Sequence, residues 1–248
     1  MRIFGLIGFP LGHSFSKKFF TEKFVKEGVS DTVYELFPVE DIHSVGGLIS
    51  DNQSLRGLNV TIPHKINVIP YLNDVDDAAD QIGAVNCISI ERREGKAWLK
   101  GYNTDAYGFG ESLKPFLKDH HRHALILGDG GAAKAVKYAL GQLGISYLSV
   151  VRTKIPGTLG YEEITEEVIK KHLLIINTTP LGTFPNIEGA PDIPYHFLNS
   201  DHVAYDLVYN PEETEFMKRA KSYGAQVKNG LEMLVLQAER SWFIWNAK

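Results

Sequence analysis

The sequence predicts an α/β protein built from two α/β domains. Short apolar runs alternate with helically spaced apolar residues along the chain, as in parallel sheets covered by helices. A glycine loop stands in the middle, where Leu127-Gly128-Asp129-Gly130-Gly131 follows one apolar run and opens a helical pattern. This position leaves the first half of the chain as a separate unit, available for a different ligand.

The first half has the patterns of strands, helices and one hairpin. Strands are expected at 3–7, 34–37 and 57–61, and helices at 16–26, about 40–50 and 74–82. Apolar runs at 85–90 and 97–99 flank the polar turn 92–95, which indicates a hairpin. The first half therefore reads as a compact α/β unit of its own.

The second half repeats this alternation. Strands are expected at 124–127 and 147–151 and near residues 173, 202 and 225, with helices between them. A helix at 106–117 connects the halves, and a helix at 230–245 is long enough to return to the first domain. We expect residues 1–103 with 231–248 to form one domain, and residues 104–230 to form a Rossmann-like domain.

Composition limits the kind of partner. The chain has 248 residues, a formal charge of −4, 44% hydrophobic and 23% charged residues, typical of a globular protein. No basic run predicts binding to nucleic acid or a membrane surface, and no apolar stretch is long enough to span a bilayer. We expect a cytoplasmic monomer or homodimer with a small-molecule partner. Cys87, the single cysteine, reads as a buried filler.

The glycine loop has the spacing of a dinucleotide-binding turn. Gly128 and Gly130 allow a tight turn and a close approach to phosphate, and Ala133 takes the third small-residue position. An acid that binds the ribose of NAD is expected about 20 residues on. The chain has Arg152 there, 24 positions after Gly128, which suits the 2′-phosphate of NADP. The plain alternatives are an ordinary strand-to-helix turn and a solvated basic turn.

Polar residues in the first half follow the ends of predicted strands, where open sheets bind ligands. Ser14 and Ser16 precede a helix and could hold a carboxylate, or either could simply cap that helix, Ser16 being favoured for this. Asn59 and Thr61 share one strand face, and the turn after Pro63 presents Lys65, which alone would read as a solvated lysine. Asp105 stands where a helix starts and could be only its cap.

Taken together and in order, these segments resemble the shikimate dehydrogenase family. The matching segments are GFPLGHSFS, NVTIPHK, GAVN, GYNTD, GDGGAAKA, VRT, NTTPLG, DLVYNP and NGLEMLVLQA. They run from Gly8 to Ala238, which is nearly the whole chain, and the ordered set is highly specific.

The resemblance implies that NADPH reversibly reduces the C3 ketone of 3-dehydroshikimate to shikimate, a step of chorismate and aromatic amino acid biosynthesis. It assigns Lys65 and Asp105 as the catalytic pair, without deciding which of them moves the proton. Other family positions carry over to the substrate: Ser14 and Ser16 with Tyr209 for the carboxylate, and Thr61, Asn86 and Gln237 for ring hydroxyls.

For the cofactor, the resemblance implies contacts to the pyrophosphate, the 2′-phosphate and the nicotinamide. The corresponding residues are Gly128, Asp129, Gly130, Gly131 and Ala132; Arg152, Thr153 and Lys154; and Thr178, Leu207 and Gly230. Asp77 matches a further cofactor position, although it also reads as a solvated residue of the acidic run 74–80.

Some residues depart from the family pattern, and other functions remain possible. Val151, Pro180 and Lys17 replace the usual asparagine, serine and proline, and Asp129 puts an acid beside the phosphates, which should weaken cofactor binding. A quinate/shikimate dehydrogenase would accept a second polyol and often use NAD, but the absence of a ribose-binding acid after Val151 argues against it. A non-enzymatic NADP-responsive regulator would not need Lys65 and Asp105.

Adjacent histidines at 120, 121 and 123 raise the possibility of a metal site. Neighbouring histidines rarely converge on one ion, and no carboxylate or cysteine completes the set. We therefore expect no metal.

Overall fold

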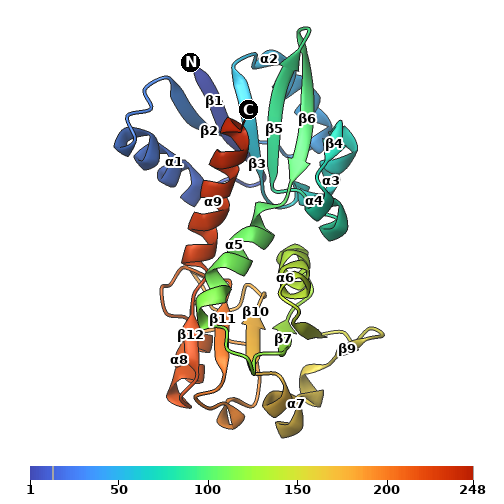
Figure 1. Ribbon diagram of the computed structural model, residues 1–248, viewed down its shortest axis with the longest axis vertical. Helices are drawn as coiled ribbons and strands as arrows, with labels where there is room; N and C mark the ends of the chain where they lie inside the picture. Colours follow the sequence, from blue (N-terminus) through green and yellow to red (C-terminus); the bar gives the residue numbers. More distant parts are fainter. Residues whose placement is uncertain (13, 248) are drawn as a thin grey trace. The chain divides into compact units, whose positions relative to one another are not determined.

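The computed structural model describes residues 1–12 and 14–247, and by its internal contacts the chain divides into two compact units. The first unit comprises Met1–Thr104 with Gln237–Lys248, and the second comprises Asp105–Leu236. Each unit contains its own sheet with helices packed on it (Figure 1).

The first unit is built on a mixed sheet with the strand order β2-β1-β3-β5-β6-β4. Strands β1, β2 and β3 run parallel, whereas β5 pairs antiparallel with β3 and forms a hairpin with β6. The strands are β1 (Arg2–Gly8), β2 (Thr32–Pro38), β3 (Leu55–Val60), β4 (Asp74–Val75), β5 (Cys87–Arg93) and β6 (Lys96–Tyr102).

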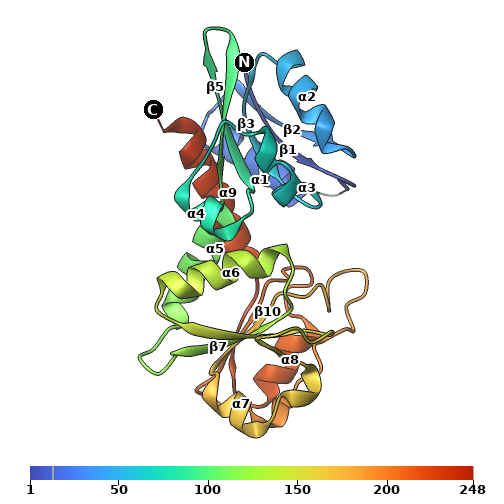
Figure 2. The ribbon, with the colours of Figure 1, turned by 90° about the vertical axis from the view of Figure 1, so that its right-hand side faces the viewer.

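Helices cover both faces of this sheet, as Figure 2 shows for α2 and α9. Alternation along β1 explains this, because Phe4 and Leu6 face one cluster while Ile7 faces another. The first cluster contains side chains of α1 and α9, and the second those of α2 and α4. The helices are α1 (Phe15–Lys26), α2 (Val45–Asp51), α3 (His64–Asn67), α4 (Asp77–Ile82) and α9 (Leu231–Asn246).

The second unit is built on a parallel sheet with the order β12-β11-β10-β7-β8-β9. Counted from β7, this is the 3-2-1-4-5-6 order of dinucleotide-binding folds, and the order reverses between β7 and β10. The strands are β7 (His123–Leu127), β8 (Ser146–Val150), β9 (Thr158–Leu159), β10 (Leu174–Asn177), β11 (Val203–Asp206) and β12 (Gln226–Lys228).

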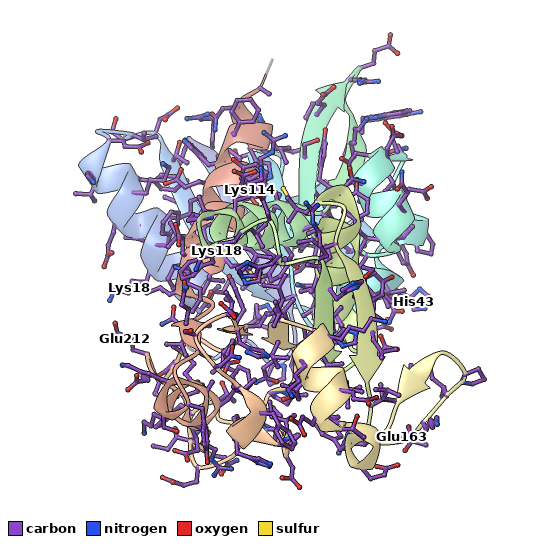
Figure 3. The ribbon with its side chains drawn as sticks, turned by 60° about the horizontal axis from the view of Figure 1, so that its bottom comes forward. Lys18, His43, Lys114, Lys118, Glu163 and Glu212 are labelled. Atoms are coloured by element: carbon purple, nitrogen blue, oxygen red, sulfur yellow. The ribbon has the colours of Figure 1, made fainter. Side chains whose placement is uncertain are left out.

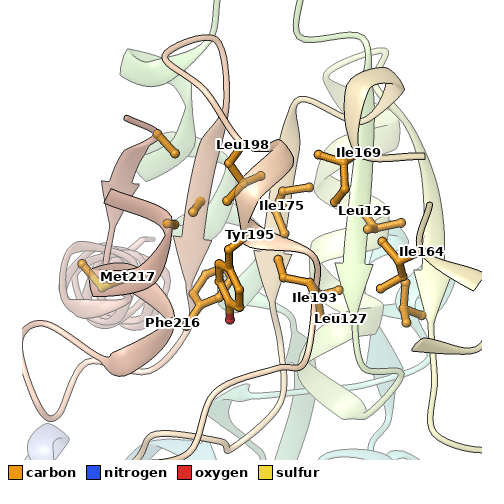
Figure 4. Close-up of a cluster of buried hydrophobic side chains, with 14 residues drawn as sticks. Leu125, Leu127, Ile164, Ile169, Ile175, Ile193, Tyr195, Leu198, Phe216 and Met217 are labelled. Atoms are coloured by element: carbon orange, nitrogen blue, oxygen red, sulfur yellow. The ribbon is translucent and has the colours of Figure 1, made fainter. Parts of the chain in front are cut away.

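The helices of the second unit also lie on both faces of their sheet, with α6 opposite α7 and α8 (Figure 2). Leu125 and Leu127 of β7 pack with Ile169 of α7 and Phe216 of α8 in a buried cluster shown in Figure 4. On the other face, Phe109 of α5 meets Tyr205 edge-on, 5.0 Å between ring centroids. The helices are α5 (Thr104–Leu113), α6 (Gly131–Gln142), α7 (Glu166–Lys171) and α8 (Glu215–Ser222).

The α/β class and the main alternation are confirmed, but several local predictions are wrong. Residues 40–50 are not one helix, because a 3₁₀ turn at Ile42–Ser44 precedes α2. The helix expected from residue 74 begins at Asp77, since Asp74–Val75 pair with β6 and Asp76 caps α4. Segment 178–202, described throughout, contains no α-helix between β10 and β11.

Two smaller differences concern candidate site residues. Strand β3 ends at Val60, so Thr61 lies just after the strand and not on its face. Helix α5 begins at Thr104, so Asp105 lies in its first turn and does not start it.

Gly57 provides a test of packing between α9 and the first sheet. The Trp245 indole stacks on Phe4 and donates from Nε1 to the Ile88 carbonyl at 2.9 Å. An added Cβ at Gly57 would overlap this indole. Gly57→Ala should therefore lower the free energy of unfolding by about 1–3 kcal/mol, measured by urea denaturation.

Gly46→Ala is the matched control, because a Cβ at Gly46 in α2 meets no atom within 4 Å. It should be neutral or stabilise by about 0.5–1 kcal/mol, since alanine favours helix over glycine. Equal destabilisation by both substitutions would contradict this account of Trp245 packing.

Candidate active site

In the first unit, hydrogen bonds to backbone carbonyls join three of the polar segments that lie at strand ends. The Val85 amide donates to the Lys65 carbonyl at 2.7 Å, and the Asn86 amide donates to the Tyr102 carbonyl at 3.0 Å. The Asn103 side chain donates to the Ala84 carbonyl at 2.9 Å. The segments NVTIPHK, GAVN and GYNTD, distant in sequence, therefore lie side by side.

Lys65 is held by the short helix α3, which follows β3. The ring of the preceding residue, His64, is buried and its Nε2 lies 2.6 Å from the Val39 carbonyl oxygen, which fixes the start of α3. The Lys65 side chain is half-buried. Asp105, also half-buried, is the first residue of the second unit.

The serine pair before α1 divides its roles differently from our prediction. Ser14, not Ser16, caps the helix, since its side chain accepts from the Lys17 amide at 3.4 Å. Ser16 lies in the first turn of α1, near the phenol of Tyr34. Burial raises the pKa of that phenol well above its usual value, so Tyr34 stays neutral. Both serines are half-buried.

The other predicted substrate residues lie in different surroundings. Thr61 packs its methyl group where a side chain at Gly8 would stand, and its amide donates to the Ile7 carbonyl at 2.9 Å. Asn86 and Gln237 are 3% and 7% exposed and share a buried polar cluster of the first unit. Tyr209, 39% exposed, follows β11 in the second unit.

The second unit carries a pocket of about 630 Å³ at the carboxyl ends of β7, β8 and β10. This is the point where the strand order reverses, the expected place for a ligand in such a sheet. The pocket is lined by Gly128, Asp129, Gly130, Val150, Val151, Arg152, Thr153, Tyr161, Thr178, Thr179, Pro180, Leu181, Ala190 and Asp192.

The glycine loop fits a phosphate group. Gly128 has a φ of +106°, and a Cβ there would stand 2.8 Å from Thr178 Oγ1. At Gly130 and Gly131, by contrast, a Cβ would meet nothing within 4 Å. Gly130 is the N-cap of α6, so the unpaired amides of that helix face this open surface.

Basic residues follow β8 at the edge of the pocket. Arg152 and Thr153 line it, whereas Lys154 pairs with Glu163 at 2.6 Å, and Glu163 is labelled in Figure 3. Hydrogen bonding to Lys154 lowers the pKa of Glu163. Asp129, the acid that should weaken phosphate binding, forms an ion pair with Lys137, which offsets part of its charge.

Six of the predicted cofactor residues line the pocket, and six do not. Gly131 and Ala132 form the first turn of α6, and the backbones of Leu207 and Gly230 are in close contact. Lys154 lies beyond the lining, and Asp77 is exposed at the start of α4 in the first unit.

Sequence reasoning missed part of the lining. Thr179 and Leu181 belong to the quoted NTTPLG segment and could have been found from it. Tyr161 begins a 3₁₀ turn, whereas Ala190 and Asp192 lie in the irregular segment after β10, and none of the three belongs to a motif.

Sequence reasoning also missed a buried carboxylate, which accepts hydrogen bonds from several of the loops beside this pocket. Asp206 at the end of β11 accepts from Asn177 Nδ2 at 3.0 Å, from the Val208 amide at 3.0 Å and from Thr214 Oγ1 at 2.6 Å. The Asn177 Oδ1 atom in turn accepts from the Thr179 amide and hydroxyl, so Asp206 supports a pocket wall indirectly.

The described residues contain no group of three histidine, cysteine, aspartate or glutamate side chains that could hold a metal. His121, in the histidine-rich segment, is instead engaged with backbone atoms of Lys118 and Asp201. Each helix in the part of the chain that the structure describes is too short or too polar to cross a membrane.

Comparisons with known proteins decide the family. Residues 6–88 match the family model of the shikimate dehydrogenase substrate binding domain. A shikimate dehydrogenase (NADP(+)) of Clostridium beijerinckii is 41% identical over 260 aligned positions, covering 99% of this chain and 92% of that protein. The chain belongs to the shikimate dehydrogenase family.

Solved structures of family members agree with the fold. A shikimate dehydrogenase crystallised with NADP⁺ is 36% identical, with a TM-score of 0.87 over 99% of this chain and 90% of that one. The Thermus thermophilus enzyme in complex with NADP(H) and shikimate is 30% identical, with a TM-score of 0.85 over 99% of this chain and 94% of that one.

Asp206 gives a pH-dependent prediction. Burial raises its pKa to about 6, against hydrogen bonds from Thr214, Val208 and Asn177, whereas the ordinary value is 3.8. Folding therefore favours the neutral form of Asp206 more than the unfolded chain does. Its stabilising contribution is complete below pH 3.8 and is lost as the pH rises through about 6.

Asp206→Asn removes this titration. Relative to wild type, the variant should gain stability between pH 4 and 7.5 by an amount on the order of 3 kcal/mol, from about two pKa units. Urea denaturation at several pH values measures the difference, with Asp119→Asn, at an exposed position of the same unit, as control. A stability difference independent of pH would contradict the buried-acid assignment.

Proposed function

We propose that this chain reversibly reduces 3-dehydroshikimate to shikimate with NADPH, a step toward chorismate and the aromatic amino acids, and that Lys65 and Asp105 are its catalytic pair. Family membership over nearly the full chain supports the reaction. The placement of Lys65 supports its role, because hydrogen bonds join its segment to the two that carry Asn86 and precede Asp105.

The chemistry needs a proton beside the reacting carbon. NADPH supplies the hydride, and the ketone oxygen becomes an alkoxide that must be protonated. The Lys65 side chain ends in an amine that can take part in this proton transfer. General acid–base catalysis of this type contributes a factor of about 10²–10⁴ in rate. In this proposal the Asp105 carboxylate is the second member of the pair and orients the Lys65 side chain. In the oxidation of shikimate, the same pair receives the proton.

The substrate is a small polyol with one carboxylate, so its recognition depends on hydrogen bonds more than on apolar area. Ser14, Ser16 and Tyr209 hold the carboxylate in this proposal. Thr61, Asn86 and Gln237 contact the ring hydroxyls. Residues 1–103 with 231–248 form the substrate domain.

The second domain, residues 104–230, holds NADP. Backbone amides of Gly128 through Ala132 bind the pyrophosphate, in agreement with the open surface over Gly130 and Gly131. Arg152, Thr153 and Lys154 bind the 2′-phosphate, and Thr178, Leu207 and Gly230 lie on the nicotinamide side. Asp77 is a further cofactor contact from the substrate domain.

The proposed setting is that of a biosynthetic enzyme of the cytoplasm with small-molecule ligands only. The formal charge of −4 offers no attraction for nucleic acid. The protein acts as a monomer or a homodimer in this proposal.

Lys65→Ala tests the catalytic role. It should lower kcat for shikimate oxidation by at least about 10², because one member of the catalytic pair is lost. The rate at which NADPH absorbance rises at saturating shikimate and NADP measures kcat. Lys18→Ala, at an exposed α1 lysine labelled in Figure 3, is the control and should keep normal turnover. Near-normal kcat in Lys65→Ala would remove the mechanism.

Arg152→Ala tests the cofactor assignment. It should raise KM for NADP by about tenfold or more and change KM for NAD little, because only NADP carries the 2′-phosphate that a guanidinium binds. Arg122→Ala, an exposed position before β7, is the control. An equal rise for both cofactors would refute the 2′-phosphate role. Wild-type turnover faster with NAD would instead favour a quinate/shikimate dehydrogenase.

A further inference from the structure

The glycine loop of the second unit carries a carboxylate beside the place where the proposed function puts a pyrophosphate. Asp129 lines the pocket, between Gly128 and Gly130, and Gly130 is the N-cap of α6. The unpaired backbone amides in the first turn of a helix attract anions, so a carboxylate of the same chain competes with a phosphate for them. The loop therefore contains a competitor of its own ligand.

The start of α6 leaves these amides open to such competition. Gly130 has no side chain to cap the helix, and no side-chain hydrogen bond caps it. A Cβ at Gly130 or Gly131 would meet no atom within 4 Å, so an anion can approach the backbone there. Aspartate is among the strongest capping residues. Without another partner, the Asp129 carboxylate would be attracted to this end of α6.

A lysine of α6 binds that carboxylate instead. Lys137 Nζ forms an ion pair with Asp129 Oδ1. Lys137 lies about two turns along the helix from Gly130, and side chains on a helix lean toward its N-terminus, so the ammonium group reaches back to the loop. Lys137 itself lies outside the pocket lining.

The ammonium group is held from a second side as well. Lys137 Nζ lies 5.9 Å from the ring centroid of Tyr147 in β8, a distance at which a cation is attracted to an aromatic ring. The Lys137 side chain is 22% exposed and that of Asp129 is 31% exposed, so water screens this ion pair less than a fully exposed one. Two contacts thus fix the position of the Lys137 ammonium group.

We propose that Lys137 is a positioning residue for cofactor binding, which withholds the Asp129 carboxylate from the α6 amides so that the pyrophosphate can bind them. Lys137 acts through Asp129 and does not itself contact the cofactor. This inference rests on the proposed function, in which the glycine loop binds the pyrophosphate of NADP. It accounts for an acid in a loop whose ligand is an anion.

Lys137→Met and Lys137→Arg form the first test. Methionine keeps the length and the helix preference of lysine and removes the charge. The dissociation constant of NADP, measured by titration calorimetry without shikimate, should rise about three- to fivefold, near the upper end for loss of a partly exposed ion pair. Arginine keeps the positive charge and should keep wild-type affinity. Unchanged affinity in Lys137→Met would contradict the proposal.

A double-mutant cycle with Asp129→Ala tests whether Lys137 acts through Asp129. With no carboxylate at position 129 there is nothing to withhold, so Lys137→Met in the Asp129→Ala background should leave the dissociation constant of NADP unchanged. Asp129→Ala alone should bind NADP at least as tightly as wild type. If Lys137→Met weakens binding equally in both backgrounds, Lys137 acts on the cofactor directly and the positioning role is wrong.

Comparison of two cofactors separates the role of Lys137 from that of Arg152. NAD and NADP share the pyrophosphate, so Lys137→Met should weaken binding of both by a similar factor, with NAD measured by its displacement of bound NADPH. Arg152→Ala should weaken binding of NADP alone. An effect of Lys137→Met confined to NADP would overturn the assignment to the pyrophosphate.

Lys170→Met is the matched control, since Lys170 is also an ion-paired lysine of the second unit, with Glu166 as its partner. It belongs to α7, on the opposite face of the sheet from α6 (Figure 2). It should leave the dissociation constant of NADP unchanged. Equal weakening by Lys170→Met and Lys137→Met would show a general effect of charge and would overturn the proposal.

Steady-state kinetics add a readout that loss of folding would not reproduce. At saturating NADP, Lys137→Met should keep the wild-type kcat and the wild-type KM for shikimate, because Lys137 touches neither the substrate nor the reacting atoms in this proposal. A lower kcat at saturating NADP would contradict it.

The wild-type titration separates this inference from the proposed function. If the wild-type chain binds NADP and Lys137→Met binds it equally well, only the inference fails. If the wild-type chain binds no NADP, the proposed function fails first.

Discussion

The hydrogen bond from the Thr104 backbone amide to the Asn86 side chain joins the segments of the first unit that carry its proposed ligand residues. It ties the segment before β5 to the start of α5, and through the Thr104 hydroxyl it reaches Gln237 on α9. A buried amide that lost this partner would have no water to replace it, so the arrangement is fixed by the cost of an unsatisfied polar group. The apolar clusters on both faces of the sheet then bring these segments within reach of one another.

The second unit depends on a different constraint. At the carboxyl ends of its strands, the backbone of one segment packs directly against the backbone of the next. The Gly128 amide donates to the Val150 carbonyl at 2.8 Å, and the Thr178 hydroxyl donates to the Leu127 carbonyl at 2.8 Å. The loop after β7 is thereby fixed to the ends of β8 and β10. A side chain at Gly128 would stand against Thr178, in a backbone conformation that L-residues rarely adopt.

Much of the fold and of the candidate cofactor site could be predicted, because strong local sequence patterns agreed with one another. Short apolar runs located β1, β7 and β8, and the glycine loop with Arg152 pointed to NADP, the cofactor of the named relatives. Short elements were mispredicted, since the pairing of Asp74–Val75 with β6 and the split at Ile42–Ser44 depend on tertiary contacts. Likewise, no pattern marks Tyr161 as a pocket residue or Thr104 as a partner of Asn86 and Gln237, because both roles arise only when distant segments meet. Asp206 was quoted in DLVYNP, yet its raised pKa depends on burial that sequence does not show.

The division between the units falls inside α9, after Leu236, so the last segment of the chain completes the unit with which the chain begins. On the ribosome, residues 105–236 emerge before Ala238, Ser241 and Trp245 do. The second unit can therefore fold while the first still lacks a cluster side chain, a buried hydroxyl and the indole that covers Gly57. Completion of the first unit thus depends on residues that are synthesised after the whole second unit, against the usual N-terminal-first order of domain folding.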